Sequence, residues 1–241
     1  MTPLIRIEKL ELKYENGRKT LPAVGPLDLE IRSGEALGLI GESGAGKSTL
    51  GLCLLGLLAR KNGRITGGRI VSALKAEEIA YIPQDPQASL DPLCAIGKFL
   101  NEICPDPGKI TEALRRVRLT GERNSLKSYP HELSGGMQQR LLIAAALLRS
   151  PKMIIADEPT ASLDMLLQRE IVRLFKEIQN TGITFLFISH NIALAGTFCD
   201  RLAIMKNGRV VEVAPTGEIF KTPSQNYTRE LIDSTPEVSR D

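Results

Sequence analysis

The 241-residue sequence contains no tryptophan, and aromatic residues make up only 4% of it. Proteins that bind single-stranded nucleic acid use aromatic side chains as stacking platforms, so this scarcity argues against such a surface. A large excess of one charge sign is also missing, since 31 basic and 28 acidic residues leave a net charge of +3. That excess is too small to attract nucleic acid or an anionic membrane strongly. We therefore expect no nucleic-acid partner.

Long hydrophobic runs are absent as well. The longest, Leu141–Leu148, falls far short of the roughly 20 residues that cross a bilayer. Residues 1–7 lack a basic start followed by an apolar block, so we expect no secretory signal. The four cysteines, at positions 53, 94, 104 and 199, form no C-x-x-C pair and have no histidine cluster nearby, which argues against a zinc site. We expect a soluble, cytoplasmic protein.

What the sequence does contain is a regular succession of strand and helix patterns. Near the N-terminus apolar and polar residues alternate, first in Ile5–Leu12 with a slip at Glu8–Lys9 that predicts a bulge, then in Leu27–Ile31. Apolar runs typical of strands buried on both faces cover residues 36–40, 79–82, 153–156 and 183–188. Helical patterns cover residues 47–59, 135–149 and 165–179, and a hairpin is predicted at residues 202–213.

This order predicts an α/β domain with a mainly parallel sheet and an antiparallel β subdomain at the N-terminus. Residues 85–133 contain proline turns and amphipathic helical stretches without a convincing strand, which indicates an inserted helical subdomain. The core then comprises residues 1–84 and 134–220. Residues 221–241 form a polar tail with two prolines, which we expect to be bound at the surface or partly loose.

A glycine-rich turn follows the apolar run at residues 36–40. Gly41-Glu-Ser-Gly-Ala-Gly-Lys-Ser48 fits G-x-x-x-x-G-K-[ST] between a predicted strand and a helix, the context that this pattern requires. The glycines let backbone N–H groups surround phosphate oxygens, and the helix N-terminus adds partial positive charge. Lys47 would reach the β- and γ-phosphates, and Ser48 would ligate Mg²⁺. The sequence thus predicts that the chain binds a nucleoside triphosphate through Gly41, Ser43, Gly44, Gly46, Lys47, Ser48 and Thr49.

Two carboxylates stand at the end of another predicted strand. Asp157 and Glu158 directly follow the apolar run at residues 153–156. In P-loop proteins the strand-end aspartate holds Mg²⁺, and this role falls to Asp157. Glu158 is then placed to orient or deprotonate the attacking water, as a general base does.

A second helix start also has the features of an anion site. Ser134 is a good N-cap, and Gly135-Gly136 leave bare backbone at the beginning of the predicted helix. One chain needs a single γ-phosphate site to bind one ATP. A second site without its own ATP indicates that it serves the nucleotide of a facing chain.

The run Leu133-Ser-Gly-Gly-Met-Gln-Gln-Arg140 resembles the signature motif of ATP-binding cassette (ABC) proteins, and the likeness extends over residues 5–220. The resemblance implies a RecA-like P-loop NTPase core. It also implies that two subunits pair head to tail and sandwich two ATP molecules, each held between one P-loop and the partner's signature. The signature residues are Ser134, Gly135, Gly136 and Gln138.

Other family elements are carried over position by position. Tyr14 looks like the aromatic that stacks on adenine, although a tyrosine in a strand is more often a packing residue. Gln84 looks like the glutamine that senses Mg²⁺ and the γ-phosphate, and His190 like the histidine that contacts that phosphate. Asp164, in Ser162-Leu163-Asp164, looks like part of the loop that crosses the dimer interface. The resemblance thus implies the catalytic set Glu158, His190 and Gln84, and the Mg²⁺ set Ser48, Gln84 and Asp157.

Three further segments resemble the peptide and nickel importer subfamily: Gln84–Pro92, Tyr129–Arg140 and Thr222–Leu231. In that subfamily two ATPase subunits, usually different, serve two permease subunits and an external substrate-binding protein. The resemblance implies ATP hydrolysis coupled to uptake of a peptide or a chelated metal at the cytoplasmic face of the cell membrane. The segment after Gln84 would contact the permeases.

Two departures favour the compact nickel-type subunits. The helical insert is shorter than in the peptide members, and the C-terminus lacks a cysteine-rich segment, so we expect no iron–sulfur cluster.

Two alternatives remain. An ABC transporter of another kind, such as an exporter, shares every catalytic motif. A soluble ABC ATPase of cofactor assembly is also compatible, whereas the long coiled coil of the DNA-repair forms does not fit into the roughly fifty residues between Gln84 and the signature. The sequence leaves open which solute moves and whether the chain pairs with itself.

Overall fold

The computed structural model describes residues 3–17, 19–119 and 126–235. Its centre is a six-stranded sheet in the order β5-β6-β7-β3-β8-β9, in which β9 alone is antiparallel to its neighbour. This confirms the predicted mainly parallel sheet and the hairpin at its edge. The strands are Ala36–Ile40 (β3), Ile79–Ile82 (β5), Met153–Asp157 (β6), Thr184–Ser189 (β7), Arg201–Lys206 (β8) and Arg209–Pro215 (β9).

The N-terminal segment forms a separate antiparallel sheet. Its order is β2 (Lys19–Arg32), β1 (Pro3–Asn16) and β4 (Gly63–Ser72). The register shifts between Ile7 and Leu10, with Lys9 in the left-handed region at φ 47°, which confirms the predicted bulge. The sequence analysis missed β4, because this edge strand buries few side chains and therefore lacks an apolar alternation.

Helix α1 (Lys47–Leu54) runs between the two sheets. Its Leu50 is fully buried among apolar side chains of both. The prediction that this helix continues to residue 59 is wrong. Gly56 adopts a left-handed conformation at φ 69°, and the chain then forms the short 3₁₀ helix η1 (Leu58–Lys61).

The opposite face of the large sheet is covered by α5 (Gly135–Leu148), α6 (Met165–Gln179) and α7 (Ile192–Gly196). Phe175 of α6 packs against Phe185 and Phe187 of β7, with ring centroids 5.4 and 6.3 Å away. Aromatic rings at this spacing add to the stabilisation from burial.

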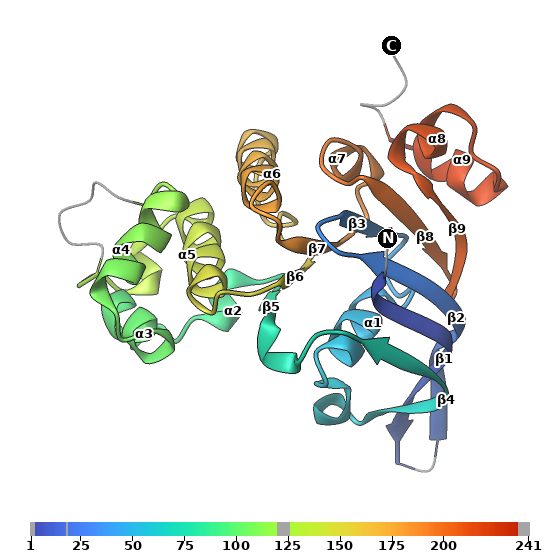
Figure 1. Ribbon diagram of the computed structural model, residues 1–241, viewed down its shortest axis with the longest axis horizontal. Coiled ribbons are helices and arrows are strands. Elements are labelled where there is room, and N and C mark those ends of the chain that lie inside the picture. Colours follow the sequence, from blue (N-terminus) through green and yellow to red (C-terminus); the bar gives the residue numbers. More distant parts are fainter. Residues whose placement is uncertain (1–2, 18, 120–125, 236–241) are drawn as a thin grey trace.

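Residues 86–116 form three helices, α2 (Pro86–Ser89), α3 (Ile96–Ile103) and α4 (Pro107–Arg116). Asp85 and Asp106 cap the first and third, each followed by a proline that suits the first helical turn. Figure 1 shows these helices gathered with α5 at one side of the molecule, away from the antiparallel sheet. Two short 3₁₀ helices, η2 (Ala76–Glu78) and η3 (Pro130–Glu132), complete the connections.

The C-terminal segment is more ordered than its polar composition indicates. It forms α8 (Thr216–Lys221) and α9 (Asn226–Asp233) beside β8 and β9 (Figure 1). Of the two expectations for the tail, bound at the surface or partly loose, the first describes residues 226–233, where Tyr227 and Thr228 are buried. Among the described residues, no helix is long and apolar enough to cross a membrane.

Candidate nucleotide site

The glycine-rich turn connects β3 to α1, as predicted, and its glycines are required by the backbone around them. Gly44 and Gly46 lie in the left-handed region, at φ 82° and 100°. A Cβ atom on Gly41 would stand 2.1 Å from the carbonyl oxygen of Met205. Other residues would strain or displace the turn, so the pattern read in the sequence has a steric cause here.

The turn is held from the side by the hairpin between β8 and β9. The Gly208 N–H donates to the Ala45 carbonyl (3.0 Å), and the Gly25 N–H donates to the Gly208 carbonyl (2.8 Å). The sequence analysis predicted this hairpin but not its contact with the phosphate-binding turn. Hairpin and turn are more than 150 residues apart, and only the sheet order brings them together.

Lys47 lies over the turn and is only 6% exposed. Its Nζ donates to the carbonyl oxygens of Gly41 (2.7 Å) and Glu42 (2.9 Å) and lies 3.8 Å from Glu158 Oε1. Burial lowers the pKa of Lys47, and the negative charges of Glu158 and Asp157 oppose that shift. The result is a cation pre-positioned among backbone dipoles.

The first helical turn of α1 meets the end of β6 through one hydrogen bond. Ser48 Oγ donates to Asp157 Oδ1 (2.8 Å), and Tyr81 Oη of β5 donates to the other carboxylate oxygen (3.2 Å). Burial raises the pKa of Asp157, the neighbouring Glu158 adds to this, and the two hydroxyl groups oppose it. A hydroxyl and a carboxylate side by side offer the hard oxygen ligands that Mg²⁺ prefers.

Mg²⁺ usually keeps several waters and binds through one or two carboxylates together with substrate phosphates. The Ser48 hydroxyl and the Asp157 carboxylate fit a magnesium ion that arrives with a nucleotide. Among the described residues there is no group of three or more His, Cys, Asp or Glu side chains that could hold a metal ion.

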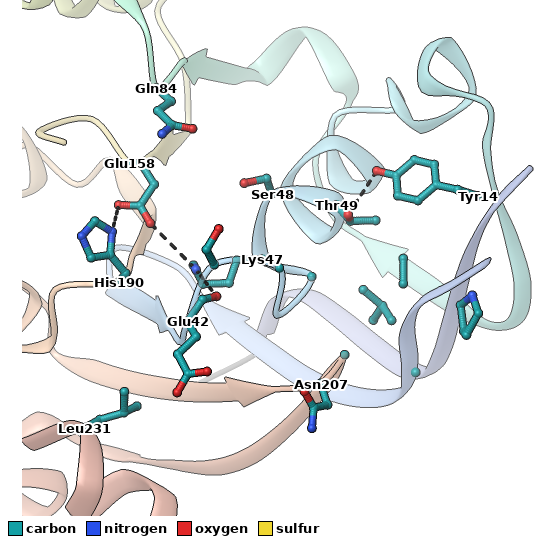
Figure 2. Close-up of a pocket in the computed structure, with 18 residues that line it drawn as sticks. Tyr14, Glu42, Lys47, Ser48, Thr49, Gln84, Glu158, His190, Asn207 and Leu231 are labelled. Carbon is teal, nitrogen blue, oxygen red and sulfur yellow. Dashed lines mark hydrogen bonds and ion pairs between the residues drawn. The ribbon is translucent and has the colours of Figure 1, made fainter. Parts of the chain in front are cut away.

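Glu158 stands next to this pair in an unusual conformation. Its backbone is left-handed at φ 46°, a strained region for a side chain of this size, and its N–H donates to the Ile188 carbonyl (2.9 Å). The carboxylate is 12% exposed and lies 2.9 Å from His190 Nδ1. Ser189 Oγ also donates to it, at 3.4 Å. The predicted acidic and histidine residues are thus in direct contact, as Figure 2 shows.

Lys47, Ser48, Glu158 and His190 line one pocket of about 1000 Å³, whereas Asp157 lies outside its lining. Tyr14 lies at one end, where its hydroxyl is 3.1 Å from Thr49 Oγ1, and Gln84 and Glu158 lie at the other (Figure 2). Of the predicted catalytic and nucleotide-binding residues, only Gly41 is not in the lining, because it lies beneath the turn. The pocket lining is Tyr14, Pro22, Ala23, Val24, Gly25, Glu42, Ser43, Gly44, Gly46, Lys47, Ser48, Thr49, Gln84, Glu158, His190, Asn207, Gly208 and Leu231.

Several of these lining residues were not anticipated. Residues 22–25 of β2, the hairpin residues 207–208 and Leu231 of α9 carry no chemical motif. These residues shape the pocket and carry none of the predicted catalytic side chains. No pattern within their own segments could have identified them, because their role comes from neighbours distant in the sequence.

The signature segment contributes no residue to this pocket among the residues that the structure describes. It forms a surface of its own at the start of α5, where Ser134 caps the helix by accepting from the Met137 N–H (3.4 Å). Ser134 and Gly135 are exposed. The signature turn packs beside residues 163–167, since a Cβ on Gly136 would lie 3.2 Å from the Leu167 side chain.

Gln138 behaves differently from the rest of the signature. Its side chain is 4% exposed, and Nε2 donates to the carbonyl oxygens of Pro130 (2.8 Å) and Leu133 (3.4 Å). Its amide therefore stabilises the signature turn from the buried side. Asp164 lies on the exposed side, where it caps α6 by accepting from the Leu167 N–H (2.9 Å).

A strand, a glycine-rich phosphate turn, a helix and a strand-end carboxylate beside that helix together define a P-loop nucleotide-binding protein. The comparisons with known proteins narrow this class. Residues 24–161 match the family profile described as ABC transporter. This chain belongs to the ABC transporter family, and it is one of the family's ATPases.

Whole-chain relatives carry names from the same family. A peptide ABC transporter ATP-binding protein from Sinorhizobium fredii (strain NBRC 101917 / NGR234) is 34% identical over 98% of this chain and 78% of its own length. A peptide import ATP-binding protein from Brucella abortus (strain 2308) is 38% identical over 98% and 76%. One from Brucella ovis (strain ATCC 25840 / 63/290 / NCTC 10512) is 37% identical over 100% and 81%.

Solved structures show the same fold. The cbiO1 protein of Clostridium perfringens, part of the ABC transporter complex cbiONQ, superposes with a TM-score of 0.79 at 26% identity and covers 99% of this chain and 98% of its own. The dimeric bacterial ABC transporter cassette MJ0796 superposes with a TM-score of 0.72 at 26% identity, covering 88% and 98%. The same cassette is also known in a post-hydrolysis state bound to ADP and Pi.

Proposed function

We propose that this chain is the ATP-hydrolysing subunit of an importer that takes up peptides. The observation that carries the proposal is the shared pocket, in which a phosphate-binding turn, a cation and a strained carboxylate come together. The choice of peptide follows from relatives named for peptide import that align over nearly the whole chain. Chelated nickel, to which the short helical insert points, is the second candidate solute.

In this proposal the turn at residues 41–48 binds the phosphates. Its N–H groups and the Lys47 ammonium surround the β- and γ-phosphates, and Tyr14 stacks on the base at the other end of the pocket. Ser48 and Asp157 would hold Mg²⁺, with Gln84 at the rim. When bound, Mg²⁺ neutralises charge that develops on the phosphate oxygens.

Glu158 acts as the base that orients the attacking water. Its contact with His190 and its strained backbone keep the carboxylate directed into the pocket. Burial at 12% exposure reduces competition from bulk water. A positioned general base contributes about 10²–10⁴-fold to a rate.

We further propose that two subunits complete each other's sites. Ser134, Gly135 and Gly136 would face the γ-phosphate of the partner's ATP, with Gln138 bracing them from behind and Asp164 beside them at the interface. The exposed side chains of Met165 (62%) and Leu166 (70%), next to that surface, support a contact between proteins here. ATP binding would close the pair and hydrolysis would reopen it, which biases the attached permeases between two states.

The remaining partners follow from the importer proposal. Two integral-membrane permeases would dock near the segment that follows Gln84, where Leu93 is 86% exposed. An extracytoplasmic binding protein would deliver the solute to them. The chain itself would work at the cytoplasmic face of the cell membrane.

The test is to isolate tagged Glu158→Gln protein with ATP from native membranes and to identify what co-purifies by mass spectrometry. Two multi-span permeases and an ATPase partner are the expected result. The extracytoplasmic binding protein associated with those permeases then identifies the solute. Recovery of soluble partners alone would reject the importer and favour an ATPase of cofactor assembly. Wild-type protein without ATP, in which the closed pair does not accumulate, is the control.

A further inference from the structure

The C-terminal helix α9 is fastened to the nucleotide-binding core by two separate sets of contacts. The first set is centred on Glu212 of β9. Its carboxylate accepts from the backbone N–H groups of Ser224 (2.7 Å) and Gln225 (3.2 Å) and from Thr228 Oγ1 (2.5 Å). Thr228 is fully buried, so the start of the helix is fixed on the sheet edge.

The second set of contacts joins α9 to the phosphate-binding turn itself. Tyr227 Oη accepts from the backbone N–H of Glu42, the first residue after Gly41 in that turn, at 3.3 Å. Its ring lies beneath the Lys206 ammonium, 4.1 Å from the ring centroid. Lys206 ends β8 directly before the hairpin that contacts Ala45. Tyr227 therefore touches both the turn and the strand that supports it.

Glu42 is held on both sides of its backbone. Lys47 donates to its carbonyl (2.9 Å), while its N–H donates to Tyr227. One of these partners belongs to the phosphate-binding machinery and the other to the C-terminal helix. Because the two share one residue, a shift of α9 would act on the stretch of backbone that Lys47 contacts.

A further residue of α9 reaches the pocket directly. Leu231 follows Tyr227 by one helical turn, so both lie on the same face of the helix. Leu231 lines the pocket, and Figure 2 shows it on the same side of the site as Glu42. The helix thus supplies both a support for the turn and part of the wall.

We propose that α9 is a working part of the nucleotide site, with Tyr227 as a positioning residue that holds the phosphate-binding turn through the Glu42 N–H. The inference rests on residues 41–48 binding the phosphates of ATP. It assigns a purpose to the segment Thr222–Leu231, which the sequence analysis recognised only as a mark of its subfamily. Because coupling between two sites is reciprocal, nucleotide binding should in turn stabilise α9.

The first test compares Tyr227→Phe with Arg229→Gln, a control on the same helix whose side chain, among the described residues, hydrogen-bonds to Pro223 and Asn226 rather than to the turn. Titration with fluorescent mant-ADP and Mg²⁺ measures the dissociation constant. Loss of one hydrogen bond should weaken binding about 3- to 10-fold in Tyr227→Phe, and the KM for ATP should rise while kcat stays constant. Equal dissociation constants for Tyr227→Phe and the control would overturn the inference.

The second test measures hydrogen exchange of the α9 amides in the wild-type chain, with and without mant-ADP and Mg²⁺. Protection of residues 226–233 should rise when nucleotide binds, and the rise should be smaller in Tyr227→Phe at equal occupancy. A merely structural tyrosine would lower protection equally in both states, which would contradict the proposal. Lys47→Ala distinguishes failure of the proposed nucleotide site from failure of the proposed role of α9. Unchanged nucleotide binding in Lys47→Ala would reject the site itself.

Discussion

Two helices of this chain start at glycines, since Gly46 is the N-cap of α1 and Gly135 is the first residue of α5, and the structure surrounds their first turns in opposite ways. At the start of α1, Lys47 is buried beside Glu158, and a Cβ on Gly41 would collide with the β8 backbone. At the start of α5, Ser134 and Gly135 are exposed. Among the described residues, a Cβ on Gly135 would meet only the Leu163 side chain, at an ordinary 3.8 Å.

The contrast separates two reasons for a glycine. Gly41 is required by its own chain, because no side chain fits under the turn. Gly135 is not required by anything that the structure describes within this chain. Its lack of a side chain leaves room for a group from outside the chain to approach the backbone closely. We infer that the α1 start is a complete half of the site and the α5 start is a half that awaits a partner.

The largest effect on this comparison should come from Glu158→Gln. Removing the base while keeping the shape should lower kcat about 10²–10⁴-fold and leave ATP binding intact. The α1 half would then hold ATP long enough for dimers to accumulate. Steady-state ATPase assays and size-exclusion chromatography with ATP measure both effects, and near-normal turnover would exclude Glu158 as the base.

Lys47→Ala should break the α1 half alone. The phosphates lose a charged partner that lies over the turn, so ATP affinity should fall about 10- to 100-fold. The α5 surface is left unchanged. A mixed dimer of Lys47→Ala with wild-type chains should therefore keep one active site, which ATPase titration of the mixture measures. Normal ATP affinity in the variant would contradict the role given to this lysine.

Gly135→Ala should break the α5 half alone. The added methyl group fits within the chain, so the melting temperature and ATP binding by the monomer should not change. Hydrolysis should fall at least about 10-fold, because the methyl group intrudes where the partner's phosphate lies. Gly217→Ala is the control, since a Cβ there meets nothing within 4 Å among the described residues and, like the one on Gly135, causes no clash. Unaltered hydrolysis would mean that the α5 start faces no nucleotide.

Asp157→Asn should have the smallest effect. It should raise the stability of the nucleotide-free protein but impair Mg²⁺ binding. Burial raises the pKa of Asp157, so its ionised form destabilises the folded state at neutral pH. The amide should raise the free energy of unfolding of the nucleotide-free protein by about 1 kcal/mol at pH 7. It should also abolish the extra stabilisation that Mg²⁺ gives to the ATP complex.

The stability gain of Asp157→Asn should disappear as the pH falls toward about 4, the usual pKa of an aspartic acid, because the wild-type carboxyl group is then protonated when folded. Urea unfolding at several pH values measures this. A gain that does not depend on pH would show that burial of charge is not its cause.

Local sequence patterns predicted the elements whose causes are local. The phosphate-binding turn needs left-handed glycines, and α6 spans Met165–Gln179 as predicted, with Asp164 as its N-cap. The bulge at Lys9 was visible because it interrupts a period-two alternation. By contrast β4 was missed and α1 was drawn too long, because an exposed edge strand and a helix stop at Gly56 leave weak patterns.

The sequence by itself determined which motifs this protein has, since its glycine-rich turn, acidic pair and signature are short segments recognisable from their residue types. Only the tertiary structure decided the neighbours. It placed Tyr227 against Glu42 and the 207–208 hairpin against Ala45. It also directed Gln138 inward rather than toward a partner. The physical reason is that motifs depend on local backbone geometry. The residues that complete the pocket lining and hold the glycine-rich turn in place depend instead on the order of strands in the sheet.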